Sequence, residues 1–254
     1  MPIKFSIITI TFNHIEGLKK TIQSVSNQNY KFKEHIIIDG NSTDGTKNFL
    51  EMLEVKFISE PDRGIYDAMN KGIKKAKGDY VIFMNAGDTF NSKNVLVDFT
   101  TQNFKADVIY GNCYVEYAYN YGRLLKPNDL KSLWKGMSFS HQTVFVKTKL
   151  LQNNLFDINY KFCADFNQIY GFYLNGKKFT YWNNTISNIE AGGVSDAQRY
   201  ISIYEVFKIN KKCSPHLKIY FYFLPKIIYS FVIVKLKRIL PTSIIKKITQ
   251  LKYR

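Results

Sequence analysis

Short apolar runs alternate with amphipathic stretches over the first ninety residues of the chain. The run at 5–11 is β-branched and almost continuously apolar, as in a strand that is covered on both faces in a parallel sheet. Apolar residues between Ile15 and Val25 then recur at helical spacing, with Asn13 as the expected N-cap. The same patterns predict strands at 35–39, 56–58 and 80–84, a helical face beginning at 49, and a helix at 65–76. This alternation predicts an α/β fold with a mostly parallel central sheet flanked by helices.

The rhythm changes after Asp88. We expect strands at 107–110, 112–117, 123–126 and 179–182, a turn at 120–122 and a helix at 165–174. The chain has no internal repeat and no low-complexity linker. Residues 1–195 are therefore predicted to form one domain, followed at 196–254 by a helical, basic and aromatic tail.

Charge is distributed unevenly between these two parts. The 254 residues include 36 Lys or Arg against 20 Asp or Glu, a formal net charge of +16, with 45% hydrophobic residues. This composition is too apolar for a disordered basic tail and too charged for a multi-span membrane protein. Residues 200–254 hold twelve basic residues and one acidic residue, a net +11, and the other 24 basic and 19 acidic residues leave +5. A basic nucleic-acid-binding α/β protein is the less favoured class, because its basic residues would extend across the main domain.

Two further features bear on the cellular setting. The three cysteines, Cys113, Cys163 and Cys213, are widely spaced and odd in number, which argues against a disulfide framework and favours a reducing, cytoplasmic environment. The chain passes from Met1 directly into a strand-like run, without the charged and apolar regions of a signal peptide. We therefore expect no secretion signal.

Polar residues follow four consecutive predicted strands, at the strand ends where ligands bind in open α/β sheets. These residues lie at 11–13, at 39, at 60–64 and at 85–88. The Gly-rich fingerprints of dinucleotide and P-loop sites are missing. Phosphate would then be neutralised by a divalent metal held by a carboxylate, for which Asp88 is well placed.

At this point the sequence resembles a known family. Four ordered segments look like the successive motifs of family 2 glycosyltransferases with the GT-A, Rossmann-like fold, and most closely like the bacterial branch that builds O-antigen and capsule polysaccharides. These segments are residues 6–13, 38–46, 61–72 and 78–88. The resemblance covers residues 1 to about 195. It implies a hexosyltransferase that moves a sugar from a UDP-sugar donor to a glycan acceptor carried on a polyprenyl diphosphate lipid.

The resemblance also implies roles for individual residues on the donor side. Thr11 and Asn13 match residues that line the nucleotide pocket. Asp39 matches the carboxylate that reads uracil, since an acceptor at a strand end can take the imide N–H of the base. Arg63 and Asp67 match a segment that closes over the nucleotide and the donor sugar.

The metal and acceptor side follows in the same way. Asp88 matches the last Asp of the DxD-type motif, which binds Mn²⁺ or Mg²⁺ at the diphosphate, although Asn85 and Gly87 stand where the family often has acids. His141 and Gln142 resemble an element near the acceptor and diphosphate. Asp165 occupies the place of the acidic catalytic motif and is the candidate general base of an inverting displacement.

Structural roles compete with each assignment. Asp39, Asn41 and Asp44 fit turn or capping positions equally well, and so do Asp88 and Asp165 at predicted helix starts. Arg63 fits a surface ion pair, and His141 fits a packed core residue. A catalytically inactive nucleotide-sugar binder also stays open, because two acids of the DxD-type motif are lost.

The tail segment 217–238 is the most hydrophobic part of the chain and is interrupted by Pro225 and Lys226. Its apolar blocks are shorter than the roughly 20 residues that cross a bilayer. Basic residues beside aromatic and aliphatic ones favour an interfacial helix on an anionic cytoplasmic leaflet. A span or re-entrant segment, and a covered helix or oligomer contact, stay open. The prediction is a cytoplasmic enzyme bound peripherally to the inner membrane, with no nucleic-acid partner.

Overall fold

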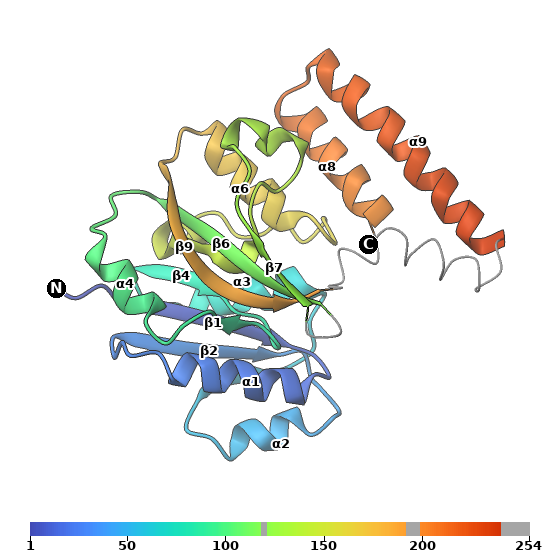
Figure 1. The fold of residues 1–254 in the computed structure, drawn as a ribbon. Coiled ribbons are helices and arrows are strands. Elements are labelled where there is room, and N and C mark those ends of the chain that lie inside the picture. The colour runs from blue at the N-terminus through green and yellow to red at the C-terminus, as the bar shows by residue number, and fades with distance from the viewer. Residues whose placement is uncertain (118–120, 192–198, 240–254) are drawn as a thin grey trace. The chain divides into compact units, whose positions relative to one another are not determined.

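The computed structural model describes residues 1–117, 121–191 and 199–239, of which 232–239 are described by their backbone alone (Figure 1). The chain divides into two compact units, residues 1–193 and 194–254, and each is described here by itself. The predicted turn at 120–122 begins outside the described residues. The predicted domain boundary after residue 195 also lies outside them, and it stays a prediction.

The first unit is built on one nine-stranded mixed sheet. The strands are β1 (Phe5–Thr11), β2 (Lys33–Asp39), β3 (Lys56–Ser59), β4 (Tyr80–Phe83), β5 (Thr89–Phe90), β6 (Val108–Tyr117), β7 (Tyr121–Leu125), β8 (Val144–Lys147) and β9 (Phe179–Glu190). Their order is β3-β2-β1-β4-β8-β6-β9-β5, with β7 paired to β6. Strands β1 to β4 are mutually parallel, as are β6 and β9, whereas β5, β7 and β8 run antiparallel to their neighbours. The predicted α/β fold with a mostly parallel sheet is confirmed.

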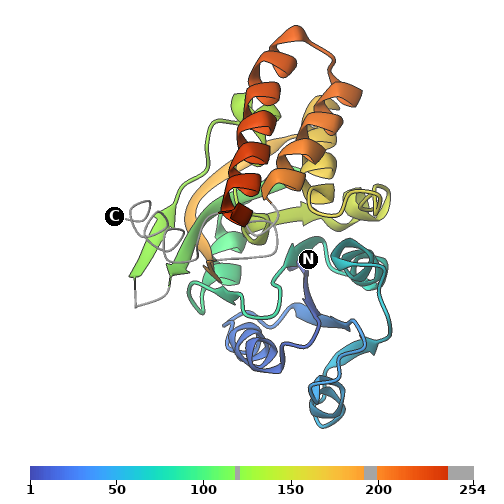
Figure 2. The same ribbon diagram turned by 90° about the vertical axis from the view of Figure 1, so that its right-hand side faces the viewer.

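Helices cover both faces of this sheet. They are α1 (Ile15–Ser26), α2 (Thr46–Glu51), α3 (Ile65–Lys75), α4 (Val95–Thr101), α5 (Thr148–Gln152), α6 (Ala164–Leu174) and the 3-10 helices η1 (Leu130–Lys135) and η2 (His141–Thr143). Because side chains alternate along a strand, Ile37 of β2 faces Leu18 of α1 and Leu50 of α2, and Ile8 of β1 faces α3. Figures 1 and 2 show α1 and α2 together on one side of β1 and β2.

Helix α3 lies unusually close to the sheet. A Cβ atom at Gly72 would collide with Cγ2 of the fully buried Ile8, so only glycine allows this approach. The same helix is tied to the loop before α6, because the Asn70 amide donates to the carbonyl of Phe156 and accepts its N–H, both at 2.9 Å. These contacts fix α3 between the sheet core and the downstream half of the unit.

The structure corrects several predicted elements. The strands expected at 107–110 and 112–117 form a single strand, β6, which is irregular at Gly111. A Cβ there would meet the Asn184 carbonyl oxygen at 2.7 Å, so the glycine marks a close approach and a bulge in a continuous strand. Strands β5 and β8 were not predicted, and β9 continues past 182 to Glu190. Asn13 is not the N-cap of α1, since His14 holds that position.

The second unit contains α8 (Arg199–Cys213) and α9 (Leu217–Ile239), which pack through Phe207 against Tyr220 and Phe223. Helix α9 runs through Pro225, although the apolar pattern breaks there. A line of exposed apolar side chains follows the helix: Leu217, Phe221, Leu224, Ile228 and Phe231, exposed by 45–79%. Within the described residues no helix combines the length and apolarity that a membrane crossing requires.

Candidate active site

The loops after β1 and β2 hold each other in place. The Asn13 side-chain oxygen accepts the Thr43 N–H at 2.8 Å, and the Asn13 N–H donates to the Ser42 hydroxyl at 2.8 Å. Asn13 adopts a φ of 50° to make these contacts, a conformation that asparagine tolerates better than most residues. The neighbouring Thr11 is buried, and its hydroxyl oxygen has no partner among the described residues. Thr11 and Asn13 therefore stand at one prebuilt loop junction.

Asp39 ends β2 as a fully buried carboxylate. It accepts the N–H of Ser42 at 3.2 Å and the hydroxyls of Ser42 and Ser59, the latter at 2.6 Å. These donors compensate the burial of its charge. The side chain therefore also fills the local turn role, and a base read by Asp39 would approach a carboxylate that already has partners. Phe12, 65% exposed, lies across Gly40 beside it.

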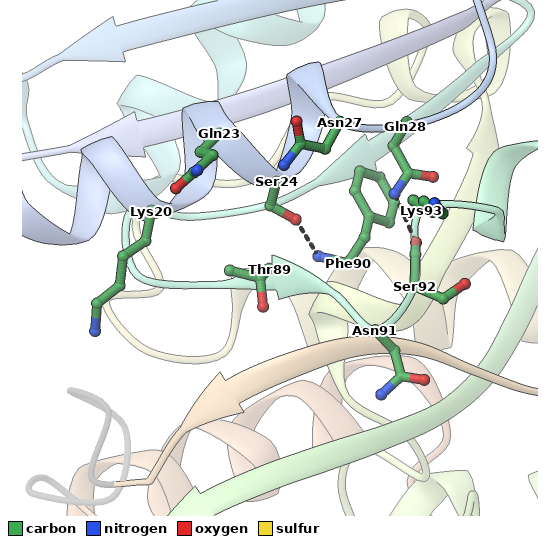
Figure 3. Close-up of a pocket in the computed structure, with 10 residues that line it drawn as sticks. All are labelled: Lys20, Gln23, Ser24, Asn27, Gln28, Thr89, Phe90, Asn91, Ser92 and Lys93. Carbon is green, nitrogen blue, oxygen red and sulfur yellow. Dashed lines mark hydrogen bonds between the residues drawn. The ribbon is translucent and has the colours of Figure 1, made fainter.

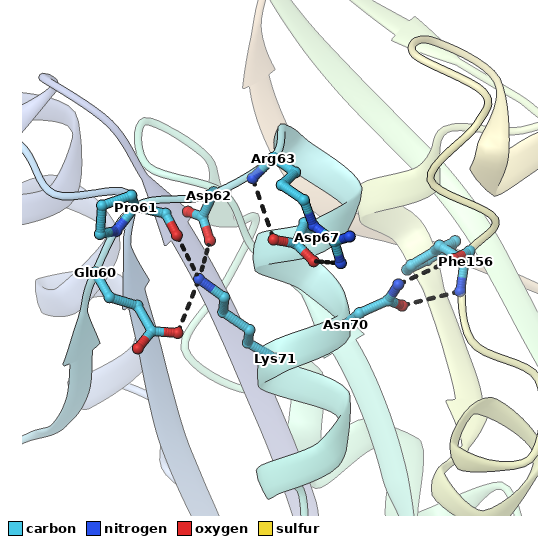
Figure 4. A network of polar contacts seen from close by, with 8 residues as sticks. All are labelled: Glu60, Pro61, Asp62, Arg63, Asp67, Asn70, Lys71 and Phe156. Atoms are coloured by element: carbon cyan, nitrogen blue, oxygen red, sulfur yellow. Dashed lines mark hydrogen bonds and ion pairs between the residues drawn. The ribbon is translucent and has the colours of Figure 1, made fainter.

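The start of α3 carries a second polar network (Figure 4). The Arg63 N–H and guanidinium both donate to Asp67 at 3.1 Å, while the Arg63 side chain stays 74% exposed. Burial alone would raise the pKa of Asp67. Hydrogen bonds from Arg63 and the charges of Arg63 and Lys71 stabilise the carboxylate, so the pKa of Asp67 lies below its usual value. Lys71 in turn pairs with Glu60 and Asp62. The Arg63 guanidinium is thus anchored at one edge and open to solvent.

Asp88 lies between β4 and β5 and is 8% exposed. Burial raises the pKa of Asp88 to about 7, opposed by hydrogen bonds from the Asn85 N–H, at 3.1 Å, and from the Gln142 side chain. The charge of Glu190 raises it further. Asp88 precedes a strand and not a helix, so the helix-cap alternative for this residue is wrong.

The donor atoms near Asp88 suit a hard cation. The enclosed Oδ1 of Asn85 has no hydrogen-bond partner in the described part of the chain, and amide and carboxylate oxygens are the ligands that Mg²⁺ and similar ions prefer. Across the described ranges, however, no group of three His, Cys, Asp or Glu side chains converges as a metal site. Asp88 and Asn85 fit a divalent metal that is held partly by its substrate.

Helix η2 places His141 and Gln142 next to each other, between two acids. Gln142 hydrogen-bonds to Asp88, whereas the charge of Asp165 acts on the His141 ring. His141 stacks on Phe83 with ring centroids 5.0 Å apart. Burial lowers the pKa of His141, against the opposing charge of Asp165, and its Nε2 atom meets no partner among the residues described. The short helix η2 thus carries an amide, Gln142, that bonds to one carboxylate and a neutral imidazole, His141, that feels the charge of the other.

Asp165 lies in the first turn of α6, and its Oδ1 accepts the hydroxyl of Tyr66 at 2.8 Å. Cys163 holds the N-cap position, so the capping alternative for Asp165 is wrong. By contrast, Asp44 does take a capping role, since its carboxylate accepts the Ile15 N–H at the start of α1 and the Thr46 N–H at the start of α2. The carboxylate of Asp165 is therefore committed to a side chain 99 residues away in sequence.

A separate pocket of about 410 Å³ lies between α1 and the segment around β5 (Figure 3). It is lined by Lys20, Gln23, Ser24, Asn27, Gln28 and residues 89–93. None of the predicted site residues lines it. Lys20 at its rim pairs with Glu190 at 3.0 Å, so the pocket opens beside the Asp88 cluster without being part of it.

The downstream side of the site comprises Asp88, His141, Gln142 and Asp165 with their neighbours. Sequence reasoning missed two of these neighbours, Tyr66 and Glu190. Tyr66 lies inside the motif at 61–72, where an aromatic residue between Arg63 and Asp67 is the only signal. Glu190 ends a strand that was predicted to stop at 182. The upstream residues Thr11, Asn13 and Asp39 come together as expected from the parallel strand ends.

The mixed sheet, with polar side chains at its strand ends, has the architecture of the GT-A fold. Mannosyltransferase PcManGT from Pyrobaculum calidifontis, solved with GDP-Man and Mn²⁺, superposes with a TM-score of 0.66 over 100% of this chain and 81% of its own, at 14% identity. TarS from S. aureus, solved with UDP-GlcNAc, gives 0.62 over 83% of this chain and 67% of its own, at 19% identity. At these identities the likeness concerns the fold.

The family model for glycosyl transferase family 2 matches residues 6–176. The chain belongs to this family and is a glycosyltransferase. It is 45% identical over 95 residues to an uncharacterised glycosyltransferase of Mycobacterium tuberculosis, an alignment that covers only 36% of either chain. It is 29% identical over 175 residues, 62% of this chain and 55% of the relative, to a Campylobacter jejuni GalNAc(5)-diNAcBac-PP-undecaprenol beta-1,3-glucosyltransferase.

Proposed function

We propose that this glycosyltransferase moves a sugar, with inversion, from a UDP-sugar to a glycan carried on a polyprenyl diphosphate, in the assembly of a surface polysaccharide such as O-antigen or capsule. The observation that carries the proposal is that two acids lie near the neighbouring residues of η2: Asp88 accepts a hydrogen bond from Gln142, and the charge of Asp165 acts on His141. Support for the substrates comes from TarS, solved with UDP-GlcNAc, and from the undecaprenol-linked acceptor in the name of the Campylobacter relative.

The donor would bind at the ends of β1 to β4. Asp39 offers an acceptor to the uracil imide, Thr11 and Asn13 border the nucleotide, and the exposed Arg63 guanidinium reaches for phosphate or sugar oxygens. Phe12 presents an open aromatic face on which a base can stack. Asp88 and Asn85 would hold Mn²⁺ or Mg²⁺, which supplies Lewis-acid stabilisation of charge on the departing diphosphate.

The acceptor would bind on the η2 and α6 side. Asp165 takes the proton of the acceptor hydroxyl while that oxygen bonds to the anomeric carbon and the bond from this carbon to UDP breaks. The neutral His141 ring offers its unpartnered Nε2 to the diphosphate or the acceptor. Attack opposite the leaving group gives inversion in a single displacement.

The test is UDP release from a panel of UDP-sugars, with polyprenyl-diphosphate-linked glycans as acceptors, with Mn²⁺ or with chelator. Release with one donor that depends on acceptor and metal, and that Asp88→Ala abolishes, supports the proposal. Binding of UDP-sugar without turnover on any acceptor would instead support an inactive nucleotide-sugar binder. Full activity of Asp88→Ala in chelator would overturn the metal assignment.

We further propose that the enzyme works at the cytoplasmic face of the inner membrane, docked through α9. The exposed residues Leu217, Phe221, Leu224 and Ile228 recur at helical spacing and so share one face, while Phe223 packs toward α8. The tail carries a net +11, which complements an anionic leaflet. An apolar face beside basic residues is the pattern of interfacial helices.

Cosedimentation with vesicles tests this docking. The full chain should bind vesicles rich in phosphatidylglycerol more tightly than phosphatidylcholine vesicles, and the pair Phe221→Ser and Ile228→Ser should weaken binding at least about tenfold, from the lost apolar burial. Tyr204→Ser on α8 removes another exposed aromatic side chain and is the matched control. Equal binding by both variants, or concentration-dependent dimers without vesicle binding, would argue against a lipid surface.

A further inference from the structure

Tyr66 is the described residue that physically joins the donor side to the candidate base. It lies in the first turn of α3, two residues after Gly64 and within the Arg63–Asp67 segment. Its side chain is 7% exposed, and its hydroxyl donates to Oδ1 of Asp165 at 2.8 Å. The bond therefore spans two helices that are distant in sequence.

The chemistry of the pair fixes the direction of this hydrogen bond. Burial, followed by the nearby charge of Asp165, raises the pKa of Tyr66 far above its ordinary value of 10. The phenol therefore keeps its proton throughout the physiological range, and the carboxylate is the acceptor. A hydrogen bond to an ionised acceptor is among the stronger kinds in proteins.

The ring of Tyr66 is held from a second direction. It packs against Phe156 with centroids 5.4 Å apart, and the Phe156 backbone is clamped by both hydrogen bonds of the Asn70 side chain. Since Asn70 lies one turn further along α3, helix and loop form one rigid support. The hydroxyl thus has a defined position toward which the carboxylate must turn.

We propose that Tyr66 is a positioning residue for Asp165: it occupies Oδ1, fixes the carboxylate rotamer, and leaves Oδ2 for the acceptor hydroxyl. The proposal rests on the proposed role of Asp165 as general base. Because Tyr66 lies between the donor-side residues Arg63 and Asp67 at the start of α3, its bond fixes the position of the base relative to the donor segment. Tyr66 itself gives up no proton and touches no reacting atom.

The test is Tyr66→Phe, which keeps the ring and its packing. We expect kcat to fall about tenfold, with the donor KM within about twofold, and the acid limb of the pH profile of kcat to move up by about one pH unit, because a donor that favours the ionised carboxylate is lost. Tyr80→Phe is the matched control: Tyr80 is equally buried, and its hydroxyl donates only to the Ala106 carbonyl, at 3.3 Å. The control should leave the acid limb unmoved.

An acid limb that stays in place in Tyr66→Phe, or that moves equally in both variants, overturns the proposal. Asp165→Asn separates the two levels: an active Asp165→Asn would overturn the general base itself, whereas an inactive one together with an unshifted Tyr66→Phe overturns the positioning role alone. If Tyr66→Phe fails to fold, 3-fluorotyrosine placed at residue 66 keeps the bond with a stronger donor. It should move the acid limb down, and no movement would contradict the proposal.

Discussion

The upstream and downstream sides of the candidate site are built in opposite ways. Upstream, Asn13 and Asp39 find their hydrogen-bond partners in the adjacent loop or turn, so that each carboxylate or amide is satisfied before any ligand arrives. Downstream, burial raises the pKa of Asp88 to about 7, and His141 keeps an enclosed nitrogen that has no hydrogen-bond partner among the described residues. The downstream groups also come from distant segments.

This difference separates binding from chemistry. Apart from the buried Thr11 hydroxyl, the polar groups of the upstream rim already have partners, so this rim costs little to maintain and orients a donor without reorganisation. Buried groups with shifted pKa values and unpaired atoms are costly to fold, and such costs concentrate where a site must act on its ligand. Substitutions downstream should therefore lower activity strongly and can raise the stability of the folded protein. Substitutions upstream should cost a modest amount of stability, as loop and helix-cap substitutions usually do.

The largest expected effect is that of Asp165→Asn. Losing the proposed general base should lower kcat by about 10²- to 10⁴-fold, with binding of the proposed UDP-sugar donor retained because the donor-side residues are untouched. Steady-state kinetics and calorimetric donor titration measure the two quantities. Asp157→Asn, in the loop before α6, is the control, since its carboxylate accepts hydrogen bonds from the neighbouring Asn159. A kcat within threefold of wild type in Asp165→Asn would show that another group is the general base.

Asp88→Asn should stabilise the metal-free protein while impairing turnover. Because burial raises the pKa of Asp88 to about 7, the native state holds a proton that the unfolded chain releases near pH 4, and stability falls as pH rises through this window. Asparagine has no proton to lose. Its advantage over wild type in urea unfolding with chelator should grow by about 2 to 3 kcal/mol between pH 5 and pH 8.

For Asp107→Asn, we expect stability to depend on pH in the opposite direction. The Lys178 N–H, followed by Lys147, holds the pKa of Asp107 below its usual value, so its contribution is present at neutral pH and lost as pH falls. That variant should be less stable than wild type at pH 8. A common response of both variants to pH would show that the buried environment of Asp88 is misjudged.

Asn70→Ala tests the joint between the two sides. It strips both partners from the Phe156 backbone, and we expect a loss of about 2 kcal/mol of unfolding free energy, together with reduced kcat through the loosened Tyr66. Asn154→Ala, whose amide merely donates to the Leu150 carbonyl on the surface, should cost under about 0.5 kcal/mol. Equal losses in the two variants would mean that α3 is not anchored by this pair.

The smallest effect is expected upstream, for Asp44→Ala. Asp44 caps α1 through Ile15 and α2 through Thr46, and losing such a cap typically costs about 1 kcal/mol. Asp44→Asn keeps an acceptor and should lose less. Thermal denaturation ranks the two variants, and activity at saturating donor should stay near that of wild type in both.

The sequence was most informative where burial is local. Continuous apolar runs predicted β1 and β4 within one residue, because strands covered on both faces leave an unbroken signal. The polar strand ends and the α/β layers followed from the same pattern. It was less informative for β8, Val144–Lys147, which is as long as β4 but lies after Asp88, where the regular alternation of apolar runs and amphipathic stretches has ended.

Contacts across long sequence separations could not be predicted. An apolar or aromatic residue reports that it is buried but not what it meets, so the bond from Tyr66 to Asp165 had no local signature. Glu190 was missed for a related reason: β9 continues because it pairs with both β6 and β5, and pairing partners are invisible in a single strand. Gly111 was mistaken for a break when it is a bulge.

The glycine at position 72 has a consequence for how this enzyme can vary. The gap between α3 and the sheet is set by the missing side chain of Gly72 against Ile8, and the same helix carries Tyr66 in its first turn and Asn70 in its middle. The added methyl group of Gly72→Ala would therefore push α3 away from the sheet. That shift would displace Tyr66 and lower the rate of a reaction whose substrates do not touch residue 72. Natural variation at position 72 would therefore alter turnover, although no residue that contacts a substrate had changed.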